Sequence, residues 1–324
     1  VTGVQTCALP IYILSVTVSF VSLNFFCNSP DGKRVLNQSG RRGRVFAMSS
    51  FLTVIPSPPY SSRRDGVQKE SLWEFTRFQG QTSTGLAMRV AVVTGGARRI
   101  GATIVNSLID DGWAVIVHCN RSLTQARQLI QRGQGAIVSG DLSNDDDLFR
   151  IIEEIHDHEL VAKAGGIDLL VHNASIYNQE DFSTVTPQEL RRFSSIHLDA
   201  PFFITQGLVP KLKAKNGSVI GMVDTSWNHA WEELAHYTST KAALRQLLVN
   251  LAGELAPDIR VNGIAPGAIL AAEWEKERFE EVLKRVPLGR AGKPEDIAHA
   301  VKFLSDAEYI TGFILPVDGG WSLT

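Results

Sequence analysis

RVAVVTGGARRIG, residues 89–101, is a short apolar run followed at once by a glycine-rich turn. Apolar positions at helical spacing continue from the turn to Ile109, so the order is strand, turn, helix. Gly95 and Gly96 let the backbone approach a bound group closely, and the free N–H groups at a helix start favour an anion. Gly101 allows the helix to pack closely against the strand. The stretch therefore predicts a phosphate-binding turn after the first strand of an α/β sheet.

The rest of the chain alternates apolar runs with segments of helical periodicity, as a parallel sheet with intervening helices requires. Further strands are expected at Ala114–Val117, Ala136–Val138, Ile167–Val171, Ser218–Val223, Arg260–Ile264 and Gly312–Val317. The predicted fold class is α/β, a single Rossmann-type doubly wound parallel sheet with helices on both faces. The domain is expected to span residues 88–324, a length that suits one extended sheet.

Polar residues follow three of the expected strands. Asp141, Asn173 and Asp224 fall at carboxyl ends, the edge at which open α/β sheets bind their ligands. Any one of them could simply cap a loop, but the three together favour a binding edge.

Tyr237 and Lys241 are four residues apart on an expected helix, so their side chains lie one turn apart on the same face. A nearby ammonium favours the phenolate, and we expect it to lower the pKa of Tyr237 from about 10 toward neutrality. Such a hydroxyl can exchange a proton with a reacting group. The pair could also be an ordinary surface pair, and the upstream motifs argue against that alternative.

The turn at residues 94–101, Asn173-Ala174-Ser175 and the Tyr237/Lys241 pair together resemble the short-chain dehydrogenase/reductase family over residues 88–324. Members of that family commonly carry a serine thirteen residues before the tyrosine, where this chain has Asp224. An ionised carboxylate only accepts hydrogen bonds, so it would repel the oxyanion of ketone reduction but bind N–H donors such as those of a pterin. Thr225 or Ser226 could instead take over the role of the serine.

Within the family the chain looks like the branch of pteridine reductases and dihydromonapterin reductases. That branch matches the arginine-containing turn, the 118–122, 141–144 and 172–175 segments, Asp224, the 262–267 segment and the ending 318–324. The resemblance implies catalysis by Asp224, Tyr237 and Lys241, with Lys241 also holding the cofactor ribose. It implies substrate contacts from Arg99, Ser175, Tyr177, Asp224 and Tyr237, with the Tyr177 ring sandwiching the pterin. Cofactor contacts are expected from Gly95, Arg98, Arg99, Ile100, Gly101, Asn120, Arg121, Ser122, Asp141, Leu142, Asn173, Ala174, Ser175, Tyr237, Lys241, Pro266 and Gly267.

The expected cofactor is NADPH. The segment Val117–Ser122 at the end of the second strand has no carboxylate for a ribose 2′-hydroxyl, whereas Arg121 offers a fork of donors for a 2′-phosphate. Arg98 and Arg99 add two cations at a helix start, where they oppose the helix dipole unless an anion binds there. They could also be solvated surface residues.

Two features limit the resemblance. His197 stands where many family members use an asparagine to hold a water for proton relay, and a histidine could either do the same or pack as a hydrogen-bonded residue. The expected substrate loop, residues 268–285, shows only an amphipathic helix around Trp274–Leu283 and fixes no side-chain specificity.

The expected reaction is hydride transfer from NADPH to a C=N bond of a pterin, with dihydrofolate as a further possible substrate. The alternatives are an NADPH-dependent carbonyl or 3-oxoacyl reductase and a non-catalytic NADPH-binding sensor, against which the Tyr237/Lys241 pair argues.

The sequence of residues 1–87 does not show the alternation of strand and helix patterns that the rest of the chain shows. Residues 1–11 look like the in-frame translation of a sequencing adapter, and residues 32–64 carry seven basic residues and no acidic one. We expect a disordered or non-native extension with Met88 as the true start, and an organelle transit peptide is the alternative.

The composition limits the kinds of binding partner that we expect. The net charge of −2 gives no case for a nucleic-acid partner, and no membrane partner is expected. Cys119 is the single cysteine after residue 87, so neither a disulfide framework nor a thiol metal site is expected. We expect a reducing, cytoplasmic location. The family resemblance implies a homotetramer built through helices at roughly residues 189–212 and 237–255.

Overall fold

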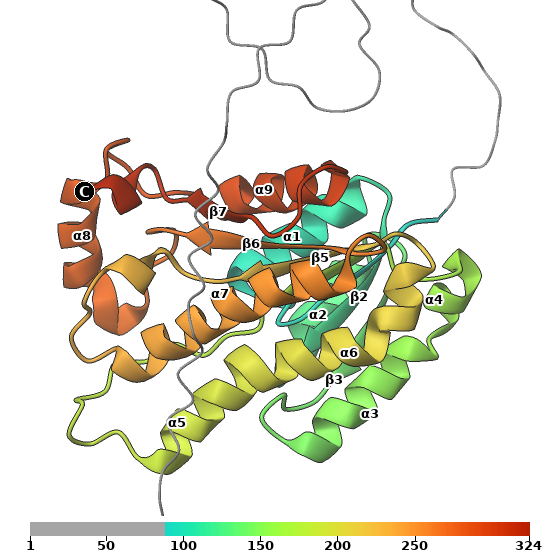
Figure 1. Cartoon of the computed structure of the whole chain (residues 1–324), viewed down its shortest axis with the longest axis horizontal. Helices are drawn as coiled ribbons and strands as arrows, with labels where there is room; N and C mark the ends of the chain where they lie inside the picture. The colour runs from blue at the N-terminus through green and yellow to red at the C-terminus, as the bar shows by residue number, and fades with distance from the viewer. Residues whose placement is uncertain (1–87) are drawn as a thin grey trace, which may run out of the picture. The chain divides into compact units, whose positions relative to one another are not determined.

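The computed structural model describes residues 88–324, which form a seven-stranded sheet in the order β3-β2-β1-β4-β5-β6-β7 (Figure 1). All neighbouring strands pair in parallel. The strands are β1 (Val90–Val93), β2 (Ala114–Cys119), β3 (Gly135–Ser139), β4 (Leu169–His172), β5 (Ser218–Met222), β6 (Arg260–Pro266) and β7 (Ile314–Val317). The predicted fold class is confirmed.

Nine α-helices lie in the described part of the chain: α1 (Arg99–Asp110), α2 (Leu123–Ile130), α3 (Asp145–His156), α4 (Glu159–Ala164), α5 (Pro187–Ser194), α6 (Ala200–Lys213), α7 (Ala235–Leu255), α8 (Lys276–Arg285) and α9 (Pro294–Asp306). A π-helical turn, Ser195–Asp199, joins α5 to α6. Short 3₁₀ turns are η2 (Thr225–Asn228), η3 (Glu273–Glu275) and η4 (Trp321–Leu323).

The helices form a layer on each face of the sheet. Residues of α3, α6 and α7 share one hydrophobic core with the sheet, and residues of α1 and α9 share the other (Figure 1). Alternate residues of β1 serve the two cores, Val90 and Val92 on one side and Ala91 and Val93 on the other. Because both faces are covered, the strand is apolar throughout, as parallel strands are.

The chain order reverses at β1, which lies between β2 and β4. Open α/β sheets bind ligands in the crevice at such a switch point, outside the carboxyl ends of the strands. The glycine turn follows β1 and Asn173 follows β4, so both lie at this crevice.

Strand boundaries differ from prediction by one or two residues. β7 begins at Ile314 rather than at Gly312, because Gly312 has a φ of +75° and leaves the extended region. The prediction for residues 1–87 lies outside the described residues. None of the helices between residues 88 and 324 has both the length and the apolar character needed to cross a membrane.

Candidate active site

The glycine turn is held by the neighbouring strand β2. The Gly95 N–H donates to Nδ1 of His118 at 3.2 Å, so the other ring nitrogen, Nε2, carries the proton and donates to the Gly140 carbonyl at 3.1 Å. Burial lowers the pKa of His118, which keeps this ring neutral. The turn, β2 and the loop after β3 are therefore fixed to one another.

The loop after β4 fixes the turn from the other side. The Asn173 side-chain amide donates to the carbonyls of Thr94 and Gly95, both at 3.0 Å. The backbone N–H groups of Asn173 and Ala174 donate to the Thr94 hydroxyl oxygen at 3.0 and 3.1 Å. Asn173 and Ala174 thus bind the turn itself, and through it shape the place where a phosphate can lie.

A cavity of about 340 Å³ lies beside the turn at the ends of β2 and β3. Three guanidinium groups line it, from Arg98, Arg121 and Arg192. The one carboxylate among its lining residues, Asp141, accepts hydrogen bonds from the hydroxyl and the N–H of Ser143. The remaining lining residues are Gly95, Ala97, Cys119, Asn120 and Ser122. The excess of donors over acceptors suits an anionic group.

Arg192 was missed by the sequence analysis. It belongs to α5, more than seventy residues after Arg121 in the sequence, and comes to this cavity only through the fold. No local motif marks it.

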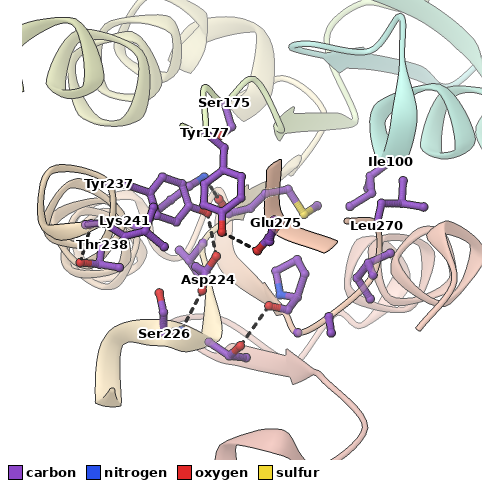
Figure 2. A pocket seen from close by; sticks show the side chains of 18 of the residues that line it. Ile100, Ser175, Tyr177, Asp224, Ser226, Tyr237, Thr238, Lys241, Leu270 and Glu275 are labelled. Carbon is purple, nitrogen blue, oxygen red and sulfur yellow. Dashed lines mark hydrogen bonds between the residues drawn. The ribbon is translucent and has the colours of Figure 1, made fainter. Parts of the chain in front are cut away.

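A second cavity, of about 260 Å³, opens at the carboxyl ends of the central strands (Figure 2). Ten of the residues predicted to be catalytic, substrate-binding or cofactor-binding line it, among them both members of the Tyr-x-x-x-Lys pair. They are Arg99, Ile100, Asn173, Ser175, Tyr177, Asp224, Tyr237, Lys241, Pro266 and Gly267.

The Tyr237 hydroxyl donates to Oδ2 of Asp224 at 2.7 Å, and Oδ1 of the same carboxylate accepts from the Ser226 N–H at 2.7 Å. Figure 2 shows the Tyr237 and Tyr177 rings beside each other, with their hydroxyls directed toward Asp224 and Glu275. The two rings lie 4.7 Å apart between centroids.

The predicted fall in the pKa of Tyr237 is wrong for this structure. Burial, and then the adjacent Asp224 carboxylate, raises the pKa of Tyr237 well above its ordinary value. The ammonium of Lys241 does not offset these effects, because it lies 5.9 Å from the ring centroid and donates to the Met222 carbonyl at 2.8 Å. Tyr237 therefore keeps its proton and can act as a donor.

Lys241 lines the cavity but is buried, with 5% of its surface exposed. Burial lowers the pKa of Lys241 to about 8, while the Asp224 carboxylate acts in the opposite direction. An ammonium has three N–H donors, so those not used by Met222 remain for a ligand in the cavity.

The expected substrate loop contributes to the cavity a carboxylate, Glu275, that the sequence analysis did not predict. Glu275, in η3, accepts from the Tyr177 hydroxyl at 2.6 Å and from the Ala272 N–H at 3.2 Å. Trp274 packs on the Tyr177 ring at 5.0 Å between centroids. The helical pattern of this loop gave no sign that Glu275 turns inward, because η3 precedes α8 and departs from its periodicity.

Arg99 joins the glycine turn to the same loop. Its guanidinium donates to the Leu270 carbonyl at 2.8 Å. Its backbone has a φ of +52°, in the left-handed region that a residue with a side chain rarely adopts. Arg99 therefore connects the glycine turn to the expected substrate loop.

His197 is fully hydrogen bonded. Its Nε2 lies 2.9 Å from the Ser175 hydroxyl oxygen and 3.3 Å from the Ile176 N–H nitrogen, and its Nδ1 lies 2.8 Å from the Thr240 hydroxyl oxygen. Both ring nitrogens are occupied by protein groups, which favours the packed, hydrogen-bonded role of this histidine over that of a water holder.

Three predicted cofactor residues line neither cavity. Gly101 and Ala174 shape the turn, and the Leu142 side chain lies in the hydrophobic core at 5% exposure, so that only its backbone can face a ligand. Among residues 88–324 no cluster of three or more histidine, cysteine and acidic side chains could hold a metal ion.

Comparison with known proteins agrees with this geometry. The family described as "Enoyl-(Acyl carrier protein) reductase" matches residues 95–322. A 3alpha-hydroxysteroid dehydrogenase from Mediterraneibacter gnavus is 33% identical over 72% of this chain and 97% of its own length. A 3-oxoacyl-[acyl-carrier-protein] reductase from Synechocystis is 30% identical over 73% of this chain and 98% of its own.

Among solved structures, the FolM alternative dihydrofolate reductase 1 from Brucella canis, complexed with NADP, is 32% identical with a TM-score of 0.65. The match covers 74% of this chain and 96% of that one.

The family match and these relatives, together with the fold, make the chain an NAD(P)-dependent oxidoreductase. The chain belongs to the short-chain dehydrogenase/reductase family.

Proposed function

We propose that this enzyme is an NADPH-dependent pteridine reductase, which reduces a C=N bond of a dihydropterin or oxidised pterin. The observation that carries the proposal is the 2.7 Å hydrogen bond from the Tyr237 hydroxyl to Asp224, at the place where carbonyl-reducing relatives would offer a serine hydroxyl. The similarity to the alternative dihydrofolate reductase of Brucella canis supports it.

The cavity's polar surface fits such a substrate. Asp224 and Glu275 both accept hydrogen bonds and both line the cavity. A 2-amino-4-oxopteridine presents several N–H donors along one edge, and carboxylates are the strongest neutral-pH acceptors for them. A simple ketone offers only an acceptor, so it would add no hydrogen bond to either carboxylate.

The residues of the other cavity fit NADPH. Arg98, Arg121 and Arg192 surround the space beside the glycine turn, and α1 has no acidic residue in its first turn to balance its cations. Guanidinium groups bind phosphate oxygens through paired N–H donors, and the 2′-phosphate distinguishes NADPH from NADH.

When bound, NADPH supplies the hydride and is oxidised to NADP⁺. The chain's own residues supply the proton and the positions. The substrate nitrogen next to the reduced carbon becomes strongly basic, so Tyr237 can protonate it through Oη when its proton turns from Asp224 to that nitrogen, although the pKa of Tyr237 is raised. Asp224 holds Oη in place, and Lys241 offers its remaining N–H donors to the cofactor ribose.

A carbonyl or 3-oxoacyl reductase is the second candidate, because the Ser226 side chain also lines the cavity. The hydroxyl of Thr225 is not available for that role, since it donates to the Pro266 carbonyl at 3.1 Å. The similarity to the Synechocystis reductase supports this second candidate.

The deciding experiment is an NADPH oxidation assay of the purified enzyme with pterins, dihydrofolate, simple ketones and a 3-oxoacyl thioester. The proposal expects turnover of pterins at the highest kcat/KM. Turnover of ketones or oxoacyl thioesters without pterin turnover would replace it with the second candidate.

Arg121→Ala is expected to weaken NADPH binding by roughly 1.5–3 kcal/mol, the scale of a hydrogen bond to a charged group, with little effect on NADH. Fluorescence titration of both cofactors measures this. Arg132→Ala is the matched control, because Arg132 bonds Asn106 and Asp110 on the surface and should leave both affinities unchanged. Equal losses for NADPH and NADH with Arg121→Ala would show that Arg121 does not contact the 2′-phosphate.

The pH dependence of kcat/KM for NADPH should reflect the ionisation of Lys241. Since its pKa is lowered to about 8, the ammonium loses its proton as the pH rises through that value, and kcat/KM for NADPH, which reports the free enzyme, should fall. Lys241→Arg retains its charge and should remove this alkaline fall. A wild-type profile that stays level up to about pH 10 would contradict the assignment.

The enzyme is also proposed to form a homotetramer through α5, α6 and α7. Four leucines lie at helical spacing on α7: Leu244 and Leu248 are in the core, and Leu247 and Leu251 are half-buried. On α6 the Phe202 side chain is 40% exposed. Exposed apolar side chains on a helix face are typical of an interface.

Light scattering at micromolar concentration should give four times the mass of one chain, and Phe202→Asp should lower it. Phe303→Asp on α9 is the matched control, since Phe303 is exposed on the other helical layer. A wild-type monomer would overturn the proposed assembly.

A further inference from the structure

We infer that His197 is a positioning residue that makes the Ser175 hydroxyl a hydrogen-bond acceptor toward the cavity. The inference rests on the proposed function only for the identity of the ligand, a pterin whose N–H group meets this oxygen. Ser175 itself is exposed and lines the cavity, whereas His197 is buried at 1% exposure behind it.

The backbone fixes which ring nitrogen carries the proton. The Ile176 N–H can only donate, and it points at Nε2 of His197 from 3.3 Å, so Nε2 is unprotonated. The neutral ring then carries its proton on Nδ1 and donates it to the Thr240 hydroxyl oxygen at 2.8 Å.

The Thr240 hydroxyl can accept the hydrogen bond that Nδ1 of His197 donates. Thr240 lies in α7, one turn after Tyr237, and its own proton goes to the Tyr237 carbonyl, at 2.8 Å. Its oxygen is therefore free to accept from Nδ1. The chain of hydrogen bonds runs from Ile176 through His197 and Thr240 to the backbone of the catalytic helix.

The protonation of the His197 ring determines whether the Ser175 hydroxyl donates or accepts. With Nε2 unprotonated, the 2.9 Å contact between Nε2 and the Ser175 oxygen is a hydrogen bond only if Ser175 donates. The Ile176 carbonyl, at 3.3 Å, is a second and longer acceptor for the same hydroxyl, so the single Ser175 proton is used inside the protein. The oxygen of this exposed residue can then only accept from a ligand in the cavity. Ser175, Asp224 and Glu275 thus present acceptors to the ligand from three different loops.

The ring has the environment this role needs. Burial, and then the ammonium of Lys241, lowers the pKa of His197 to about 2, so the ring stays neutral while Nε2 accepts two hydrogen bonds. The Phe193 ring packs edge-on against it at 5.5 Å between centroids. A charged ring would donate from Nε2 and reverse the Ser175 hydroxyl.

The first test is ¹⁵N NMR of the NADPH-bound enzyme labelled at histidine, with His197→Gln identifying the signal. The expected spectrum shows a neutral ring protonated at Nδ1 and unchanged from about pH 5 to 9, where an ordinary histidine titrates. A ring protonated at Nε2, or one that titrates in this range, would overturn the inference whatever the substrate proves to be.

The second test is a double-mutant cycle read out as KM and kcat for a dihydropterin. His197→Leu should raise KM roughly tenfold, about the worth of one hydrogen bond, with a smaller change in kcat. His197→Gln should restore most of the affinity, because its amide oxygen can accept from Ser175 and its NH₂ can donate to Thr240.

In a Ser175→Ala background, His197→Leu should change KM less than about twofold, because its effect passes through the hydroxyl. Equal effects in both backgrounds would show a merely structural role and overturn the inference. Absence of pterin turnover by the wild type would contradict the proposed function instead, and the NMR experiment would then decide the role of His197 alone.

Discussion

Replacing Asp224 with serine is expected to lower turnover of a dihydropterin about a hundredfold, the usual scale for losing an acid/base group. The substitution removes the acceptor that holds the Tyr237 hydroxyl at 2.7 Å and that, in the proposed function, accepts from the N–H donors of the substrate. Ketone reduction should hold or rise, because a serine hydroxyl can donate to a carbonyl oxygen as it becomes negative. The measurement is kcat with each substrate at saturating NADPH.

Two variants serve as controls. Tyr237→Phe removes the proton donor and should impair both reactions. Ser226→Ala removes the hydroxyl on which the second candidate function depends, and it should leave pterin turnover near the wild-type value. If Asp224→Ser spares pterin reduction while Tyr237→Phe abolishes it, Asp224 is a bystander and the carbonyl-reductase proposal takes precedence.

Gly101→Ala should destabilise the fold and disrupt cofactor binding together. An added Cβ would lie 2.3 Å from the Gly95 carbonyl oxygen and 2.6 Å from the Asn173 amide nitrogen, both of which are held by the turn. Overpacking of this kind costs about 1–3 kcal/mol, which lowers the Tm of a domain of this size by several degrees. Because the turn itself must move, the free energy of NADPH binding should weaken by more than the free energy of unfolding does.

Gly253→Ala provides the matched control. Gly253 lies within α7, and a Cβ added there meets no atom within 4 Å. Alanine in a helix interior is favoured over glycine by about 0.5–1 kcal/mol, so this variant should melt slightly higher and bind NADPH normally. Differential scanning calorimetry and a fluorescence titration measure both properties. A Gly101→Ala enzyme that melts and binds like the wild type would show that the turn is more adaptable than its contacts suggest.

The parts of the site that follow from local sequence could be predicted. The apolar run before Gly95 predicts β1 because both faces of the strand are covered, and the Tyr237/Lys241 pair shares a face because helical spacing is regular. Asp224 was recognised because its position is fixed by its distance from Tyr237. Each of these depends on neighbours in sequence.

The parts that depend on distant packing could not be predicted. Glu275 reaches Tyr177 only when the substrate loop folds over the cavity, and the two residues are 98 positions apart. The pKa of Tyr237 was predicted in the wrong direction, because the Lys241 pair is visible in the sequence whereas burial is not. The donor and acceptor sense of Ser175 depends on Ile176, His197 and Thr240 meeting in space.

Arg99 shows how far stability and activity compete at one position. Its left-handed backbone conformation lowers the free energy of unfolding by about 1 kcal/mol or more. A glycine at this position would not carry that cost. The Arg99 guanidinium, however, donates to the Leu270 carbonyl, and both residues line the cavity. Efforts to make the enzyme more heat-resistant would therefore tend to select Arg99→Gly, and the resulting protein would survive higher temperatures with a looser substrate loop and slower turnover. Thermal screening alone would reward the wrong variant at this residue.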